Sequence, residues 1–337
     1  MMRSATRMRP WRLLPLGLTL AALAGLPYGL PGSYYVNVAS QILLYAIFAL
    51  GLSVLVGYAG LVSLGHAGLF GLACYGIAYL LAAGHGHSMA IVTSLAITIG
   101  GTAVFAALSL RTTGIGFIMI TLALGEILWG LAYRWISITN GDNGINVASR
   151  PSPFGLSLAS AGQFYYATLL MFLLAVAAVS MFVHSPLGAA LRGTRDQPRR
   201  MNALGYHVWM IRFWACLFSG LLTAIAGILF VYYNQFISPQ TLALTSSAEV
   251  LLMVISGGAS TLLGPIVGAA LVVIVKNVVS AYIERWNFML GAIFVAIVLL
   301  MPEGLVPGTV RLWRTAARAL RRRSDLPAAV SGTDLQQ

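Results

Sequence analysis

The chain has 337 residues, of which 59% are hydrophobic and only 8% are charged. Soluble proteins carry about a quarter charged residues, so a water-soluble enzyme is close to excluded, and the apolar content excludes disorder. Twenty basic residues face eight acidic ones, for a net charge of +12. Because the bases lie between long apolar runs, their excess indicates membrane topology rather than nucleic-acid binding.

Apolar runs long enough to cross a hydrocarbon core of about 30 Å recur along the chain. The predicted spans are 13–30, 36–56, 67–83, 88–110, 114–133, 164–184, 213–235, 248–263, 265–283 and 286–301. Runs 248–263 and 265–283 are hard to separate, so eight or nine full crossings with re-entrant pieces fit nearly as well. We therefore predict an all-α polytopic membrane helix bundle of about 8–10 transmembrane helices with discontinuous or re-entrant segments.

The first run, 13–30, also resembles a signal peptide, with a basic start and Ala22-Leu23-Ala24 as a cleavage-like site. Its removal would leave an odd number of crossings, which disagrees with the charge distribution described next. We therefore expect it to be a retained helix.

Basic residues mark one side of the membrane. Sixteen of the 20 precede the first span, follow the fourth, separate the sixth and seventh, or follow the last: Arg3, Arg7, Arg9, Arg12, Arg111, Arg192, Arg195, Arg199, Arg200, Arg212, Arg311, Arg314, Arg318, Arg321, Arg322 and Arg323. The positive-inside rule then places both termini in the cytoplasm. The expected organisation is a basic N-terminus (1–12), a transmembrane domain (13–301) containing a cytoplasmic loop (185–212), and a basic tail (302–337) with a disordered end. The tail suits an amphipathic helix on anionic membrane lipid.

Glycine clusters interrupt two apolar runs, at 57–71 and 256–269. Unwound backbone at membrane depth survives only where protein or a water-filled cavity covers it, so paired interruptions indicate a transport path. The alternative is that glycine lets helices pack closely, as in Gly264-xxx-Gly268. We predict that the path is lined from both clusters, by Ser63, Gly65, His66, Gly257, Gly258, Ser260 and Thr261.

Three charged residues lie within apolar runs, where an ionisable group normally faces a cavity or a partner. Glu126 is a further candidate for the substrate path, and Glu249 and Lys276 could pair with it or with each other. A structural buried pair is the equal alternative. His66 stands alone, which favours a hydrogen-bonded histidine at a helix end over a proton relay.

The sequence lacks the residue patterns that ATP hydrolysis and metal binding require. Lys276 is the only lysine and Asn277 follows it, so the chain has no phosphate-binding loop and is not its own ATPase. Cys74 and Cys216 lack metal-binding spacing, and Asp142 stands in an Asn-Gly-rich turn with too few carboxylates for calcium. We expect no metal, no cofactor and no catalytic residue.

The loop 185–212 is predicted to form two short amphipathic helices. Ser185-Pro186 begins the first, Leu187, Ala190 and Leu191 give it an apolar stripe, and Pro198 begins or kinks the second, which ends at Gly205. Such helices form a surface that another protein could grip. Lying on lipid headgroups is an equal alternative on physical grounds.

Four segments together resemble a known family: 57–76, 111–128, 185–208 and 257–269. In this order they are similar to the inner-membrane permeases of branched-chain amino-acid ABC importers, LivM-type subunits in particular, from about residue 36 to 308. The chain has Pro198 where that family usually carries an acidic or polar residue, and Asn202 where it often carries a Glu. The chain also lacks the Asp near Ser63 that sugar permeases of the superfamily commonly carry.

The resemblance implies a permease that works with a second homologous permease, two cytoplasmic ATP-binding subunits and a periplasmic substrate-binding protein, and with no nucleic acid. Residues 185–208 would be the loop that couples to the ATPase, with the contact residues Leu191, Arg192, Arg195, Asp196, Arg200, Ala203, Leu204 and Gly205. Alternatives are an importer of urea, short amides or another small solute, and an ion-coupled secondary transporter that uses Glu126, Glu249 and Lys276.

Overall fold

The computed structural model describes residues 23–27, 32–147, 150, 160–280, 282, 286–301, 304–309 and 311. The expected N-terminal region 1–12, most of the first span 13–30 and nearly all of the tail 302–337 lie outside the described residues. The regular secondary structure of the described part is helical apart from one pair of two-residue strands, which confirms the predicted all-α membrane bundle.

Among the residues that the structure describes, five helices are long and apolar enough to cross a membrane. They are α2 (Ser33–Ser53) with its π-helical continuation η2 (Val54–Ala59), α4 (His87–Ser109), α5 (Ile115–Arg134), α7 (Ala161–His184) and α10 (Val208–Asn234). Four apolar helices are shorter: α3 (His66–Ala82), α11 (Leu244–Gly257), α12 (Gly264–Ser280) and α13 (Trp286–Leu300). These nine elements match the predicted spans from 36–56 onward.

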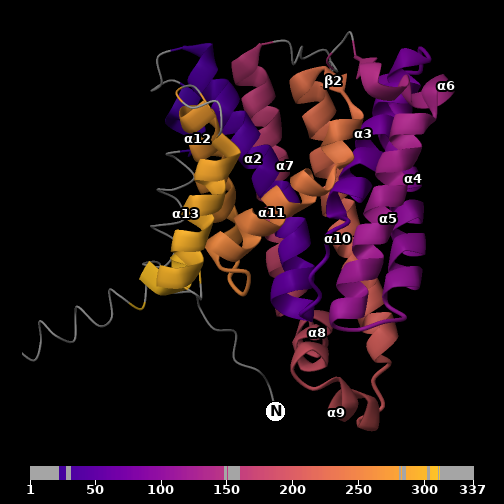
Figure 1. The fold of residues 1–337 in the computed structure, drawn as a ribbon, viewed down its shortest axis with the longest axis vertical. Coiled ribbons are helices and arrows are strands. Elements are labelled where there is room, and N and C mark those ends of the chain that lie inside the picture. Colours follow the sequence, from indigo (N-terminus) through magenta and orange to yellow (C-terminus); the bar gives the residue numbers. More distant parts are fainter. Residues whose placement is uncertain are drawn as a thin grey trace, which may run out of the picture.

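The two runs that were hard to separate are distinct helices. The chain between Gly257 and Gly264 is not helical, and Gly258 has a left-handed φ of 112°. With 14 residues, α11 is about 21 Å long, too short to cross the hydrocarbon core. In Figure 1 it runs obliquely through the middle of the bundle. The predicted discontinuous segment is therefore α11 with the turn that follows it.

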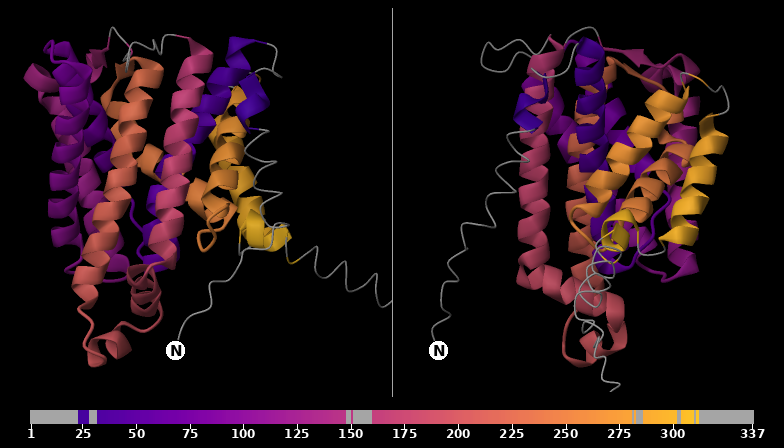
Figure 2. Two further views of the ribbon diagram at one scale, coloured as in Figure 1. Left: turned by 180° about the vertical axis from the view of Figure 1, so that it is seen from behind. Right: turned by 90° about the vertical axis from the view of Figure 1, so that its left-hand side faces the viewer.

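The helices form one bundle with distinct ends (Figure 1). α12 and α13 lie on one side and α4 and α5 on the other, with α2, α3, α7 and α10 between them. At one end, β1 (Ile145–Asn146) pairs antiparallel with β2 (Phe236–Ile237), close to α6 (Ile136–Thr139). At the other end α8 (Pro186–Asp196) and α9 (Pro198–Ala203) project beyond the long helices, as Figure 2 shows from two further sides.

α2 forms the centre of the packing. In the most apolar 18-residue stretch of α2 and η2, 83% of the residues are buried, against 22% in the corresponding stretch of α5. Outward-facing side chains of α5 and α7, such as Met119 and Leu170, are large, apolar and exposed. Such surfaces suit lipid or another membrane protein and would not be stable in water.

The loop after α6 is a turn, as its Asn-Gly sequence predicts. Asn140, Gly141 and Gly144 all have left-handed φ values, and the Asn140 side chain donates to the Gly144 carbonyl at 3.0 Å. Among the described residues no cluster of His, Cys, Asp or Glu could hold a metal ion.

Candidate functional site

The first glycine cluster breaks the helical path between α2 and α3. The π-helix η2 ends at Ala59, Gly60 turns the chain with a φ of 69°, and helix resumes only at His66. A β-carbon on Gly57 would overlap the backbone carbonyl of Ala259. The two interrupted segments that the sequence singled out therefore touch each other, backbone against backbone.

The second cluster closes a tight hairpin between α11 and α12. β-Carbons on Gly257 and Gly268 would overlap the backbone of the facing helix, so both glycines serve close packing. Thr261 shapes the turn, since its hydroxyl donates to the Gly258 carbonyl and accepts from the Gly264 N–H, both at 3.0 Å. For these residues the packing alternative accounts for the glycine pattern.

A cavity of about 320 Å³ lies where the two segments meet. It is lined by Val56, Gly57, Arg195, Ile255, Ala259, Ser260 and Pro307. Of the predicted path residues, Ser260 lines this cavity and is exposed. Ser63, Gly65 and His66 lie instead in a buried layer between helices.

His66 ties three helices together. Its Nε2 lies 2.8 Å from the Ser219 hydroxyl and its Nδ1 lies 3.0 Å from the Ser63 hydroxyl. Ser219 donates its proton to the Gly51 carbonyl at 2.6 Å, so it must accept from His66, which fixes the proton on Nε2. Ser63 then donates to Nδ1. With a residue exposure of 2%, His66 acts as the hydrogen-bonded histidine at a helix end rather than as a cavity-lining ligand.

Replacing His66 by alanine is therefore expected to destabilise the protein by about 2–4 kcal/mol, because it opens a cavity and leaves two buried hydroxyls short of a partner. His85 offers a matched control, since it is exposed and makes a single 3.3 Å contact with the Leu80 carbonyl. Thermal unfolding of the purified protein checks the difference. Equal melting temperatures for the two alanine variants would contradict the structural role of His66.

The charged residues within the bundle separate into a pair and a single group. Lys276 Nζ lies 3.1 Å from both carboxylate oxygens of Glu249, which joins α12 to α11. Glu126, on α5, is half-buried and has no hydrogen-bond or ion-pair partner in the described part of the chain. The three charges do not form one group. The role of Glu126 in the substrate path stays a prediction. If the Glu126→Gln variant transports like the wild type at several substrate concentrations, Glu126 does not line the path.

The loop helices begin and end as predicted. The Ser185 hydroxyl accepts from the Gly188 N–H at 3.2 Å, Pro186 occupies the first turn of α8, and Pro198 begins α9. Gly205, with a φ of 85°, lies in the turn that ends α9. Together α8 and α9 are called the loop-helix pair below.

Three arginines fasten the loop-helix pair to the bundle. Arg192 donates to the Val183 carbonyl at the end of α7 at 2.9 Å, and Arg212 of α10 donates to the Thr194 carbonyl at 2.9 Å. Arg195 donates to the Gly57 carbonyl, and its side chain packs against Gly60. α8 therefore moves with the ends of α7 and α10, and its Arg195 reaches the first interrupted segment.

One predicted contact residue of this loop needs correction. Leu191 is fully buried beneath the bundle, so it anchors α8 and cannot touch a separate protein. Arg195 is exposed on α8 while its guanidinium donates to the Gly57 carbonyl, and its contact with a partner stays a prediction. The remaining predicted contact residues are also exposed, on α8, on α9 or in the turn after it: Arg192, Asp196, Arg200, Ala203, Leu204 and Gly205. Sequence reasoning could not find the Arg195 contact, because 138 residues separate it from Gly57.

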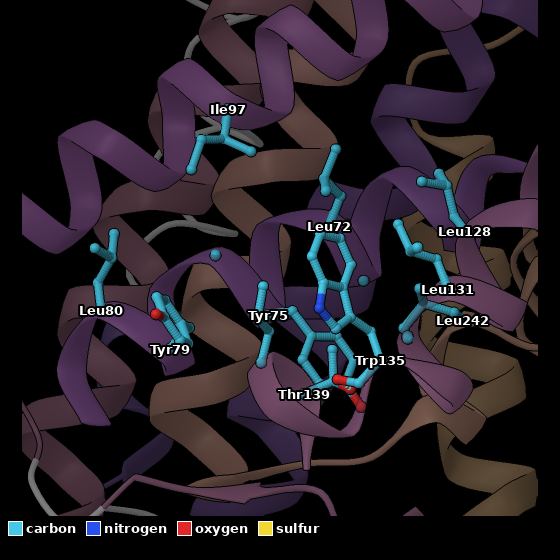
Figure 3. A pocket seen from close by; sticks show the side chains of 14 residues that line it. Leu72, Tyr75, Tyr79, Leu80, Ile97, Leu128, Leu131, Trp135, Thr139 and Leu242 are labelled. Carbon is cyan, nitrogen blue, oxygen red and sulfur yellow. Dashed lines mark hydrogen bonds between the residues drawn. The ribbon is translucent and has the colours of Figure 1, made fainter. Parts of the chain in front are cut away.

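An apolar pocket of about 480 Å³ lies between α3, α5 and α6 (Figure 3). The labelled side chains around it are almost all aliphatic or aromatic, and the buried Tyr75 hydroxyl has no partner in the described part of the chain. A charged or zwitterionic solute would lose its hydration here without replacement. This pocket therefore does not suit such a ligand.

Comparisons with known proteins agree with this arrangement. A family model described as branched-chain amino acid transport system / permease component matches residues 34–298. The high-affinity branched-chain amino acid transport system permease protein LivM of Escherichia coli K12 is 28% identical over 300 residues, 81% of this chain and 70% of the relative. LivM of Salmonella typhimurium LT2 is 28% identical over 303 residues, with the same two shares.

A solved structure shares the fold. It was assigned to the metal-chelate type of ABC transporter in an inward-facing conformation, and it aligns with a TM-score of 0.50 over 86% of this chain and 99% of that chain. The identity is 16%, so this likeness concerns the fold alone. Since the family model covers most of the sequence, the chain belongs to the permease components of branched-chain amino acid transport systems.

Proposed function

We propose that the chain is the permease subunit of a binding-protein-dependent ABC importer for branched-chain amino acids. It forms the translocation path in the inner membrane, with both termini in the cytoplasm. A second homologous permease, two ATP-binding subunits and a periplasmic binding protein complete the importer. Family membership and the names of the LivM relatives support the substrate, and the fold shared with an ABC transporter supports the ATP-driven mechanism.

The contact between Arg195 and Gly57 carries the proposal. It joins the loop-helix pair, which projects from the bundle, to the point where the two interrupted segments meet. An ATPase that grips the exposed face of α9 would displace α8, and Arg195 would transmit that displacement to Gly57. The contact between Gly57 and Ala259 is then free to open or close as the bundle alternates between two packings. ATP binding needs to bias that equilibrium by only a few kcal/mol.

The ion-coupled alternative finds less support in the structure. A secondary transporter needs its ionisable groups to act together on ion and substrate, but Glu126 lies on α5, apart from the Glu249–Lys276 pair of α11 and α12. Such a transporter also has no use for a helix pair held outside the bundle by three arginines. An importer of urea or short amides would have the same architecture, so only the transported substrate distinguishes it from an importer of branched-chain amino acids.

The test of the proposed function is substrate titration of the reconstituted importer. The cognate binding protein is titrated with leucine, isoleucine, valine, urea and acetamide, and ATP-driven uptake into proteoliposomes is then measured with each ligand. We expect the three branched-chain amino acids to bind and to accumulate, and urea and acetamide to do neither. Uptake of urea or acetamide in preference to leucine would contradict the substrate assignment.

A further inference from the structure

A second, polar cavity lies between α2, α10, α11 and α12 and the short helix η5 (Pro239–Leu242). Its volume is about 640 Å³, within the range of roughly 300–1,000 Å³ typical of small-molecule sites. The chain that forms one wall carries a hydroxyl-rich stretch between β2 and the first turn of α11. Six residues carry the argument: Tyr45, Phe230, Thr245, Ser246, Glu249 and Lys276.

The Glu249–Lys276 ion pair faces this cavity. Both residues line it, and their side chains are 19% and 32% exposed although they belong to apolar helices. Charges within a membrane bundle are costly and normally face a partner or a solute pathway. Here one carboxylate and one ammonium group stand 3.1 Å apart with access to the same space. The cavity therefore offers a matched pair of opposite charges to a ligand.

The cavity also has a helix end and an apolar wall. Thr245 and Ser246 lie in the first turn of α11, where the positive end of the helix dipole favours an anion. The rings of Tyr45 and Phe230 also line the cavity and stand edge to face with centroids 6.4 Å apart. A ligand that fills the cavity would thus meet two charges, two hydroxyls and an aromatic surface.

We propose that this cavity binds a zwitterionic amino acid with an apolar side chain inside the permease. The α-carboxylate binds Lys276 and the first turn of α11, the α-ammonium binds Glu249, and the side chain packs on Tyr45 and Phe230. This inference rests on the proposed function and deepens it, because it places a selective site for the substrate class within the membrane domain. An uncharged amide cannot replace either half of the ion pair and binds weakly.

The position on α11 gives binding a mechanical consequence. Glu249 is eight residues from Gly257, about 12 Å along the helix axis. The turn beyond Gly257 carries Ala259, which touches Gly57, and Arg195 holds Gly57 from the side of the loop-helix pair. Ligand binding at one end of α11 and ATPase movement at the other therefore act on the same short helix.

Direct binding is tested by thiol protection in the detergent-purified importer. Ser246→Cys places a thiol on the cavity wall, whereas the native Cys74 and Cys216 are buried. We expect saturating leucine to slow labelling by a water-soluble maleimide severalfold and 4-methylpentanamide to have no effect. Adding Lys276→Met should abolish protection without slowing the labelling itself. Absence of protection by leucine, or equal protection by the amide, would overturn the proposal.

Transport kinetics separate a binding role from a structural one. Glu249→Gln and Lys276→Met should each raise KM for leucine about tenfold or more, the loss expected for one charge-assisted hydrogen bond. Asn277→Ala is the control, since Asn277 pairs with Gln41 at 3.1 Å outside the cavity wall and should leave KM unchanged. The double variant Glu249→Lys with Lys276→Glu keeps the ion pair but exchanges the positions of its carboxylate and its ammonium group. A bound amino acid would have to turn around to match them.

The exchanged double variant decides between the two roles. We expect it to restore the amount of assembled importer but not KM, because a reversed ligand turns its side chain away from Tyr45 and Phe230. Full recovery of KM would show a purely structural pair and overturn the proposal. If the wild-type importer moves no leucine, the proposed function fails, while protection of Ser246→Cys by leucine still tests the site by itself.

Discussion

Gly57→Ala is expected to abolish leucine uptake and to lower the melting temperature of the permease. The added β-carbon would overlap the carbonyl of Ala259, and because the obstacle is backbone, a rotamer change cannot relieve it. Overpacking in a well-packed interior typically costs about 1–3 kcal/mol, and a clash with fixed backbone lies at or above the upper end. Thermal unfolding and proteoliposome uptake measure the two effects.

Gly100→Ala is the matched control for this substitution. Gly100 lies within α4, and a β-carbon there would meet no atom within 4 Å. Alanine should stabilise the helix there by up to about 1 kcal/mol and leave uptake unchanged. Wild-type stability and uptake for Gly57→Ala would contradict the contact between the two interrupted segments.

Arg195→Ala is expected to uncouple ATP hydrolysis from transport. Removing the guanidinium breaks a charge-assisted hydrogen bond to Gly57, worth about 1.5–3 kcal/mol, so displacement of α8 no longer reaches the interrupted segment. We predict that substrate-stimulated ATP hydrolysis and leucine uptake fall about tenfold or more. Basal hydrolysis and co-purification of the ATPase should persist, because the exposed face of α9 is unaltered.

Arg111→Ala controls for loss of an arginine at the same end of the bundle. Arg111 is exposed in the turn between α4 and α5, and its loss leaves the Arg195–Gly57 contact intact, so stimulation should persist. Stimulation at the wild-type level in Arg195→Ala would show that α8 does not act through Gly57. Loss of ATPase co-purification in that variant would instead return Arg195 to the role of a docking residue.

The bundle could be predicted from the sequence because membrane spans follow directly from apolar length and charge placement. Ser185-Pro186, Pro198 and Gly205 also marked the ends of α8 and α9, since capping and turn preferences are local. The glycine cluster 256–269 marked the interruption, although the predicted span ran to residue 263 and α11 ends at Gly257. The sequence could not show whether a glycine lines a transport path or allows close helix packing, because that depends on which backbone segment contacts the glycine in the fold.

The candidate site shows the same limit. The Arg195 contact and the cavity behind Glu249 join residues far apart in the chain, and a single sequence carries no signal for such pairs. Leu191 was misassigned because an apolar stripe on a short helix looks the same whether it faces the bundle or a partner. One local signal was overlooked: the run of Ser and Thr from Ser238 to Ser247, between two apolar segments, marks the wall of the polar cavity.

The most direct measurement of the central claim compares leucine uptake by the purified chain alone with uptake by the full importer. Both are placed in proteoliposomes, with ATP, with an imposed ion or proton gradient, and with neither. We predict concentrative uptake only when the ATP-binding subunits, the second permease, the binding protein and ATP are all present. Gradient-driven uphill uptake by the chain alone would contradict it.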